Sequence, residues 1–214
     1  MRYIDFHTHT VAKTEKVLRI CNCYPSDAVK DLEAFSVGIH PWYIHEDWET
    51  QLALLKEKAQ GENCYAIGEC GLDKLTDTDF ELQEVLFRKQ VAISEAIQKP
   101  LIIHCVKAFQ EIYNLKKELQ PTQTWVLHGF VKSEQLANQM LSIGCKLSFG
   151  NTLLENLKLQ RTFAKLNVTD FVLETDTTEV AIEEIYKKAA ILQKLGVSSM
   201  QQQIEHNCKE IFKR

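Results

Sequence analysis

The chain has 214 residues, a length that fits one large domain, and its 45% hydrophobic and 25% charged side chains exclude global disorder. Its 25 basic and 29 acidic residues give a formal net charge of −4, which excludes a strongly basic nucleic-acid coat protein. No apolar run approaches the roughly 18 residues of a membrane helix, and residues 1–5 lack the apolar core of a secretion signal. We therefore expect a cytoplasmic protein with no membrane partner.

The seven cysteines are scattered along the chain and show none of the regular spacing of a disulfide framework. Reduced, structural thiols are the better interpretation, and this agrees with a cytoplasmic location. No linker, charge block, low-complexity stretch or internal repeat divides the sequence, so we expect a single domain over residues 1–214.

Short apolar runs rich in β-formers recur along the chain, and most are continuous, as in strands covered on both faces. The predicted strands are residues 3–6, 17–23, 35–39, 64–68, 101–104, 124–128, 145–149 and 171–174. Helical patterns lie between the later strands, over 79–98 and 179–194. Ser199 with Gln202 resembles a capping box that opens a last helix.

Eight strands alternating with helices predict a trimmed α/β fold, a TIM-like (β/α)8 barrel, with an open doubly wound sheet as the alternative. Such barrels typically need about 250 residues, with about 200 as the lower end, so this one must be trimmed. Only residues 7–16 separate the first two predicted strands, which is too short for a crossover helix. We therefore expect the first crossover helix to be missing.

Histidines and acids stand at the ends of these predicted strands. They are His7 and His9, His40, Glu69 and Asp73, His104, His128, and Glu174 with Asp176. The carboxyl ends of the strands of a parallel barrel share one rim, which holds the active site. An open doubly wound sheet does not explain this pattern, so the strand ends favour the barrel.

Imidazole and carboxylate donors together suit divalent metals such as zinc or manganese. His7 and His9 are two apart on a strand and point to one face, so a cation can bind both, with Asp176 as an oxygen ligand. His104 and His128 suit a second cation, and Glu69 lies between the groups and can bridge both ions. The sequence thus predicts two divalent ions (Zn, Mn or Mg).

Each residue also has a structural interpretation when it is taken alone. His128 can be a core histidine bonded to the backbone, Glu69 a surface acid, and Asp176 a helix cap. A lone His-x-His pair also occurs often by chance. The combination of five histidines with the two acids Glu69 and Asp176 at strand ends of one polarity favours the metal site.

Several motifs follow one another along nearly the whole chain. They are Asp-Phe-His-Thr-His at 5–9, Val-Gly-Ile-His-Pro-Trp at 37–42, Ala-Ile-Gly-Glu-Cys-Gly-Leu-Asp at 66–73, the helix with Gln83, Phe87 and Gln90, Pro-Leu-Ile-Ile-His at 100–104, Leu-His-Gly-Phe at 127–130, Glu-Thr-Asp at 174–176, and Asn207 with Phe212. In this order they make the chain similar to the TatD family of metal-dependent hydrolases. The resemblance implies a divalent-metal deoxyribonuclease with endonuclease or 3′-exonuclease activity. It also implies one metal on His7, His9 and Asp176, a second on His104 and His128, and a bridging Glu69.

The sequence departs from the family pattern around the substrate. After the fifth strand the family usually carries His-x-Arg-x-Ala, whereas this chain reads His104-Cys105-Val106-Lys107-Ala108. Lys107 partly replaces the charge of the missing arginine. A proline usually follows the Glu-Thr-Asp motif, but here Thr177 does, and we expect Glu179 to run straight into a helix.

The leading functional hypothesis is two-metal hydrolysis of phosphoester bonds in short or single-stranded DNA by a monomer. Asp176 is placed to accept the proton of the attacking water, and Glu69 shares the metals. His40 and Lys107 are candidates for holding phosphate, and Trp42 is a candidate for stacking on a base, as Phe130 is. A strand-end His40 stacked on Trp42 is the structural alternative, and ordinary packing at the rim is the alternative for Trp42 and Phe130.

Two other functions stay open at this point. A hydrolase of a small molecule with an amide, lactone or phosphomonoester bond would fit the same metals, because fold does not fix substrate. The net charge of −4 and the missing arginine favour it somewhat. A non-catalytic metal-binding member is the third possibility, although none of the six metal ligands is missing.

Overall fold

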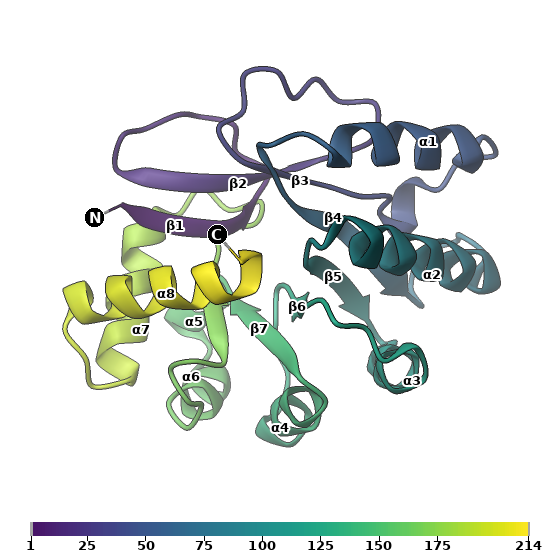
Figure 1. Cartoon of the computed structure of the whole chain (residues 1–214). Helices are drawn as coiled ribbons and strands as arrows, with labels where there is room; N and C mark the ends of the chain where they lie inside the picture. Colours follow the sequence, from purple (N-terminus) through teal and green to yellow (C-terminus); the bar gives the residue numbers. More distant parts are fainter. Residues whose placement is uncertain (1, 214) are drawn as a thin grey trace. The chain divides into compact units, whose positions relative to one another are not determined.

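The computed structural model describes residues 2–213, which fall into two compact units. The first unit comprises residues 2–20 with 128–213, and the second comprises residues 21–127. Figure 1 shows the elements of both. Each unit is described by itself, and the prediction of one domain over residues 1–214 stays a prediction.

The second unit contains four complete strands and the helices between them. Its elements are β3 (Phe35–Val37), the short 3-10 helix η1 (Pro41–Tyr43), α1 (Trp48–Ala59), β4 (Cys64–Asp73), α2 (Phe80–Ile97), β5 (Leu101–Val106), α3 (Phe109–Leu119) and β6 (Trp125–Leu127). Strand β2 (Val17–Cys23) contributes its last three residues. Strands β2 to β6 pair in chain order, and every pairing is parallel.

The first unit contains the remaining elements. They are β1 (Tyr3–Thr8), α4 (Glu134–Ser142), β7 (Cys145–Phe149), α5 (Thr152–Glu155), α6 (Leu157–Phe163), β8 (Phe171–Leu173), α7 (Ile182–Leu192) and α8 (Val197–Phe212). Strand β7 pairs with β8 in parallel, and Thr8 at the end of β1 forms a parallel bridge with Asp176. Helix α8 packs on β1 and β8, where Phe6 stacks on Phe212 with ring centroids 5.1 Å apart.

The order of elements is the one expected for a trimmed (β/α)8 fold. No helix lies between β1 and β2 in the described residues, as predicted, and none lies between β2 and β3 either. A short antiparallel bridge between Thr14 and Val17 takes the place of the first crossover helix. The expected strands 17–23 and 145–149 match β2 and β7 residue for residue.

Three details of the helices differ from the sequence-based expectation. Helix α8 starts at Val197 after Gly196, so Ser199 lies inside it and caps nothing. Helix α7 starts at Ile182, which leaves Glu179 in a loop. In α2 the buried face includes Gln83 and Gln90, amides that an apolar stripe does not predict.

Two glycines are required where neighbouring strands come close together. Gly71 in β4 has φ +150°, and a Cβ atom there would lie 1.9 Å from the backbone oxygen of His104. A Cβ atom on Gly38, after β3, would lie 2.6 Å from the backbone oxygen of Glu69. The two glycines therefore allow the strand ends to approach closely: Gly38 lies against the backbone of Glu69 in β4, and Gly71 lies against the backbone of His104 in β5.

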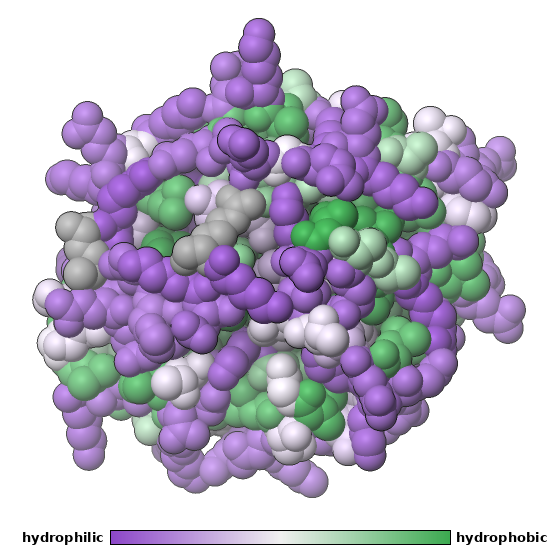
Figure 2. Space-filling model, in the orientation of Figure 1, coloured by the Kyte–Doolittle hydropathy of each residue, from purple (hydrophilic) through white to green (hydrophobic). Residues whose placement is uncertain are grey.

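The helices of residues 2–213 include no candidate for crossing a membrane, and one face of the surface is mostly hydrophilic. On the face drawn in Figure 2, hydrophilic side chains dominate and apolar residues appear in small separate patches. Within residues 2–213, every helix falls short of the length or the apolar composition needed to cross a membrane. Six of the seven cysteines are buried, as expected for structural thiols.

Candidate metal centre

The second unit gathers three potential metal ligands at the ends of its strands. His40 follows β3, Glu69 lies in β4, and His104 lies in β5. The Oε1 atom of Glu69 is 3.1 Å from Nε2 of His40 and 3.0 Å from Nδ1 of His104. One donor atom from each of the three residues lies within 4.8 Å of the others, and all three side chains are buried. This set therefore has the size and the chemistry of a divalent-cation site.

His104 is also oriented from its other side. Its Nε2 atom lies 2.9 Å from Oδ2 of Asp73, the last residue of β4. The same carboxylate accepts hydrogen bonds from Nε1 of Trp42 at 2.6 Å and from the backbone N–H of Leu75 at 2.8 Å. Burial raises the pKa of Asp73, but the hydrogen bonds from His104, Leu75 and Trp42 outweigh burial and hold the pKa below its usual range. Asp73 is thus an ionised acceptor that fixes the imidazole of His104, as carboxylates behind metal-binding histidines do.

Buried amides fix the backbone around these ligands. The side chain of Gln90 exchanges two hydrogen bonds with the backbone of Ile39, next to His40. The side chain of Gln83 accepts the backbone N–H of Asp73 at 2.8 Å and donates to the Asp73 carbonyl at 3.1 Å. The Oδ1 atom of Asn22 in β2 accepts the backbone N–H of Glu69 at 2.7 Å. Each amide satisfies a backbone group that the strand ladder leaves open, so the ligands are held by a rigid scaffold.

The first unit gathers a second donor set. His7 and His128 lie with their ring centroids 4.5 Å apart, and Oδ1 of Asp176 is 3.7 Å from Nε2 of His7 and 3.6 Å from Nε2 of His9. One donor atom from each of His7, His128 and Asp176 lies within 4.8 Å of the others. The backbone aligns β1 with the chain after β8, because Asp176 N–H donates to the His7 carbonyl and His9 N–H donates to the Asp176 carbonyl.

Two buried acids support this second set. Glu174 accepts hydrogen bonds from the backbone N–H of Gly129 at 2.6 Å and from the Ser148 hydroxyl, and its Oε1 lies 3.6 Å from Nδ1 of His128. Burial raises the pKa of Glu174, but His128 and its other partners outweigh this and lower it, so Glu174 stays ionised beside His128. Asp5 accepts two hydrogen bonds from Thr175, and burial raises its pKa to about 7.

The sequence-predicted residues are distributed over these two sets as follows. His7, His9, His128 and Asp176 lie together in the first unit, and His104 and Glu69 lie together in the second. His40, expected to contact substrate, lies beside Glu69 as a further donor and also packs edge-to-face on Trp42 at 5.0 Å. Trp42 is 55% exposed, and Lys107 is exposed in the loop after β5.

Of the two interpretations of Phe130, packing fits the structure, because the side chain is buried against Phe149 with ring centroids 5.8 Å apart. The expected direct run of Glu179 into a helix is wrong, because five residues separate Asp176 from α7.

Sequence reasoning missed the positioning roles of Asn22, Gln83 and Gln90. The signal was present as polar amides inside otherwise apolar segments. Asn22 lies between two buried cysteines in β2, and the two glutamines are seven apart on the buried face of α2. Residues seven apart on a helix share one face, and in the structure this face of α2 is buried and the helix packs on β4.

The donor chemistry of both sets suits a divalent cation, because each combines two imidazoles with one carboxylate and keeps at least two of its three ligands largely buried. In the second unit, Glu69 and His104 would hold the ion with His40 beside them, and in the first unit His7, His128 and Asp176 would do so. These donors fit zinc and manganese best, since imidazole is a poor ligand for magnesium.

Comparisons with known proteins agree with this chemistry. A metal-dependent hydrolase of Haemophilus influenzae is 31% identical over 157 residues, covering 69% of this chain and 60% of that protein. One from Buchnera aphidicola is 36% identical over 146 residues, covering 66% of this chain and 55% of that protein. A protein of Rahnella named 3′-5′ ssDNA/RNA exonuclease TatD is 29% identical over 147 residues, covering 66% of this chain and 56% of that protein. The matches thus span little more than half the length of these relatives.

Solved structures share the fold over the full length. The crystal structure of YjjV, a TatD homolog of Escherichia coli, has a TM-score of 0.84 at 21% identity and covers 100% of this chain and 98% of that chain. A TatD family hydrolase of Entamoeba histolytica has a TM-score of 0.83 at 15% identity and covers 99% of this chain and 98% of that chain. These likenesses confirm the predicted α/β fold class, a trimmed barrel of the (β/α)8 kind. The model of the TatD-related DNase family matches residues 6–213, so the chain belongs to this family of metal-dependent hydrolases.

Proposed function

We propose that the chain hydrolyses phosphoester bonds with two divalent ions, and that its substrate is short or single-stranded DNA. The observation that carries this proposal is the pair of donor sets, His40–Glu69–His104 and His7–His128–Asp176, each at the ends of parallel strands. Two divalent ions would lower the pKa of a water and neutralise the charge that builds up on the phosphoryl oxygens. The six ligands of the proposal are His7, His9, His128 and Asp176 in the first unit and Glu69 and His104 in the second.

The protein groups have separate tasks in this proposal. Asp176 accepts the proton of the attacking water, because its carboxylate is partly exposed and lies beside two imidazoles. Glu69 would supply its carboxylate to both ions. Asp73 keeps His104 in one orientation through the 2.9 Å hydrogen bond.

Three further residues serve the substrate in the proposal. His40 and Lys107 contact phosphate oxygens, and the exposed ring of Trp42 stacks on a base while its indole N–H stays on Asp73. A nucleic-acid substrate is supported by the name of the Rahnella relative, and the family description as DNase points the same way. A cytoplasmic, monomeric protein of one domain completes the proposal.

Hydrolysis of a small molecule is the second candidate function. It is favoured by Val106, which stands where the family usually has an arginine, since an arginine fork binds phosphate in a bidentate manner that Lys107 does not reproduce. Weak binding of phosphate would not reduce activity on an amide or lactone substrate, because neither carries a phosphate.

A nuclease assay tests the proposal. An end-labelled single strand and the same strand in a duplex are incubated with Mn²⁺ or Zn²⁺ at several salt concentrations. We expect cleavage of the single strand that weakens steeply with salt, and little cleavage of the duplex. The His104→Ala variant is the inactive reference. Hydrolysis of an amide or lactone panel with no cleavage of either DNA would contradict the proposal and support the second candidate.

A further inference from the structure

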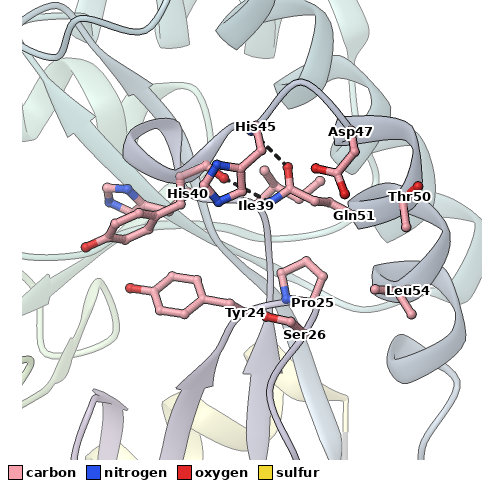
Figure 3. A pocket seen from close by; sticks show the side chains of 11 residues that line it. Tyr24, Pro25, Ser26, Ile39, His40, His45, Asp47, Thr50, Gln51 and Leu54 are labelled. Atoms are coloured by element: carbon pink, nitrogen blue, oxygen red, sulfur yellow. Dashed lines mark hydrogen bonds between the residues drawn. The ribbon is translucent and has the colours of Figure 1, made fainter.

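A cavity of about 360 Å³ opens beside His40, and all of its walls belong to the second unit. Figure 3 shows Tyr24 and Pro25 on one side of it and His45 and Gln51 on the other, with Asp47 and Thr50 farther from His40. The same His40 lies 3.1 Å from Glu69, so one wall of the cavity is part of the second unit's donor set. None of the functions assigned so far uses this cavity.

The end of the cavity near His40 is aromatic. The rings of Tyr24 and Tyr43 meet edge-to-face with centroids 4.9 Å apart, and the Tyr43 ring lies 5.6 Å from that of His40. Burial, and to a smaller extent the neighbouring Tyr43, raises the pKa of Tyr24 above its ordinary value, so the phenol is neutral at neutral pH. Buried Ile39 adds an apolar surface. A flat, uncharged ring matches these walls better than a phosphate or a sugar does.

The other end of the cavity is polar and acidic. Asp47 stands at the N-cap position of α1, yet its side chain makes no capping hydrogen bond, and it lines the cavity with Thr50. A carboxylate only accepts hydrogen bonds and repels phosphate, so this end selects N–H donors. The wall is held in shape by Gln51, which accepts the His45 N–H at 3.2 Å and donates to the Tyr43 carbonyl at 2.9 Å.

We propose that this cavity binds one base of the nucleic-acid substrate, with a preference for guanine, and so determines base specificity. This rests on the proposed function, which it deepens. The base lies against Tyr24 and Tyr43, and its Watson–Crick edge meets Asp47, where the N1–H and N2–H of guanine offer two donors to one carboxylate. The phosphate of that nucleotide then lies toward His40. The volume is at the lower end of the range for small-molecule sites, about 300–1,000 Å³, and suits a single nucleoside.

Binding of nucleosides tests the cavity without any hydrolysis. Deoxyguanosine, deoxyadenosine, deoxycytidine and thymidine lack the phosphate, so neither metals nor turnover contribute to the signal. Saturation-transfer NMR titrations of the full chain measure each Kd. We expect deoxyguanosine to bind at least about fivefold more tightly than thymidine, whose single N–H lies between two carbonyls.

Two variants and two matched controls locate the site. Asp47→Asn should abolish the preference for deoxyguanosine. Tyr24→Leu should weaken the binding of all four nucleosides by about tenfold, because stacking on the ring is lost. Asp77→Asn, an exposed acid elsewhere in the unit, and Tyr113→Leu, a half-buried tyrosine on α3, should change neither affinity nor preference. The controls separate loss of the site from a general effect on the protein.

The outcomes distinguish this proposal from the one it rests on. Nucleoside binding that is absent, or that both Asp47→Asn and Tyr24→Leu leave at the wild-type values, would overturn the base site. Guanine-selective binding that these variants abolish supports the base site, even if no DNA is cleaved. Absence of DNA cleavage would contradict only the proposed nuclease activity. In an active enzyme, dinucleotides that differ in one base should show the same order in kcat/KM.

Discussion

The Nε2 atom of His104 lies 2.9 Å from the Oδ2 atom of Asp73. The other ring nitrogen, Nδ1, lies 3.0 Å from Glu69, so the two carboxylates hold the imidazole from opposite sides. Only Glu69 belongs to the donor set, and Asp73 receives two further hydrogen bonds from Trp42 and Leu75. Asp73 is therefore a positioning residue whose own orientation is fixed by its neighbours.

The Asp73→Asn variant should keep the fold and lose metal affinity or kcat/KM by about 10- to 100-fold, because an amide orients the ring less well than a carboxylate. Metal titration and steady-state kinetics measure the two effects, and far-ultraviolet circular dichroism checks the fold. The exposed Asp77→Asn serves as the charge-matched control. Wild-type metal affinity and kinetics in Asp73→Asn would show that the hydrogen bond has no positioning role.

Glu69→Ala should be more damaging than the loss of any single histidine. The proposal gives this carboxylate to both ions, so its removal takes a ligand from each and increases their mutual repulsion. We expect almost complete loss of activity and of at least one metal, with the fold retained. A variant that keeps two metals per chain and most of its turnover would rule out the shared position of Glu69.

Val106→Arg should raise the affinity for single-stranded DNA and steepen its salt dependence. Val106 is the last residue of β5, directly before exposed Lys107, and an arginine there restores a bidentate phosphate contact. One added contact should increase the slope of log K against log salt by about 0.7 for a single strand. Fluorescence anisotropy at several salt concentrations measures the slope, and Val106→Leu is the size control. An unchanged affinity and slope would place Val106 away from the phosphate path.

Glu95→Gln should destabilise the protein by about 1 kcal/mol near neutral pH. Glu95 at the end of α2 accepts hydrogen bonds from Thr122 and Gln123, and although burial raises its pKa, these bonds outweigh burial and lower it. Since the pKa is lower in the folded state, the stabilisation is complete above the unfolded value of 4.5 and is lost as the pH falls through the folded value. Urea unfolding at pH 7 and at low pH should show a difference between the two proteins that shrinks on acidification. A difference that stays constant with pH would contradict this assignment.

The sequence predicts strands and helix ends well where one local signal decides them. Strand β7 coincides with the predicted strand 145–149, in which Cys145, Leu147 and Phe149 alternate with polar residues. Helix α2 begins at Phe80, one residue after the expected start, and Asp79 caps it by accepting a hydrogen bond through its side chain. The predicted start of α8 at Ser199 was wrong, because the helix already begins at Val197, directly after Gly196. A capping motif in sequence does not exclude an earlier start.

The site is harder to predict because its supporting contacts are tertiary. Strand ends identify His104, Glu69 and His40 as neighbours, but the hydrogen bonds that Gln83 and Gln90 send to Asp73 and Ile39 depend on how α2 packs on β4. On α2, apolar Val85 is 44% exposed, whereas the amides of Gln83 and Gln90 lie on the buried face. Polar groups that satisfy backbone at strand ends are invisible to a hydrophobic pattern.

The most direct test of the two-metal account is metal analysis of the purified chain combined with turnover of bis(nitrophenyl) phosphate. The account predicts up to two divalent ions per chain, hydrolysis that a chelator abolishes, and recovery of activity when Zn²⁺ or Mn²⁺ is added back. Chains that bind two ions and leave the phosphodiester intact, or that hydrolyse it at full rate after the metal is removed, would contradict it.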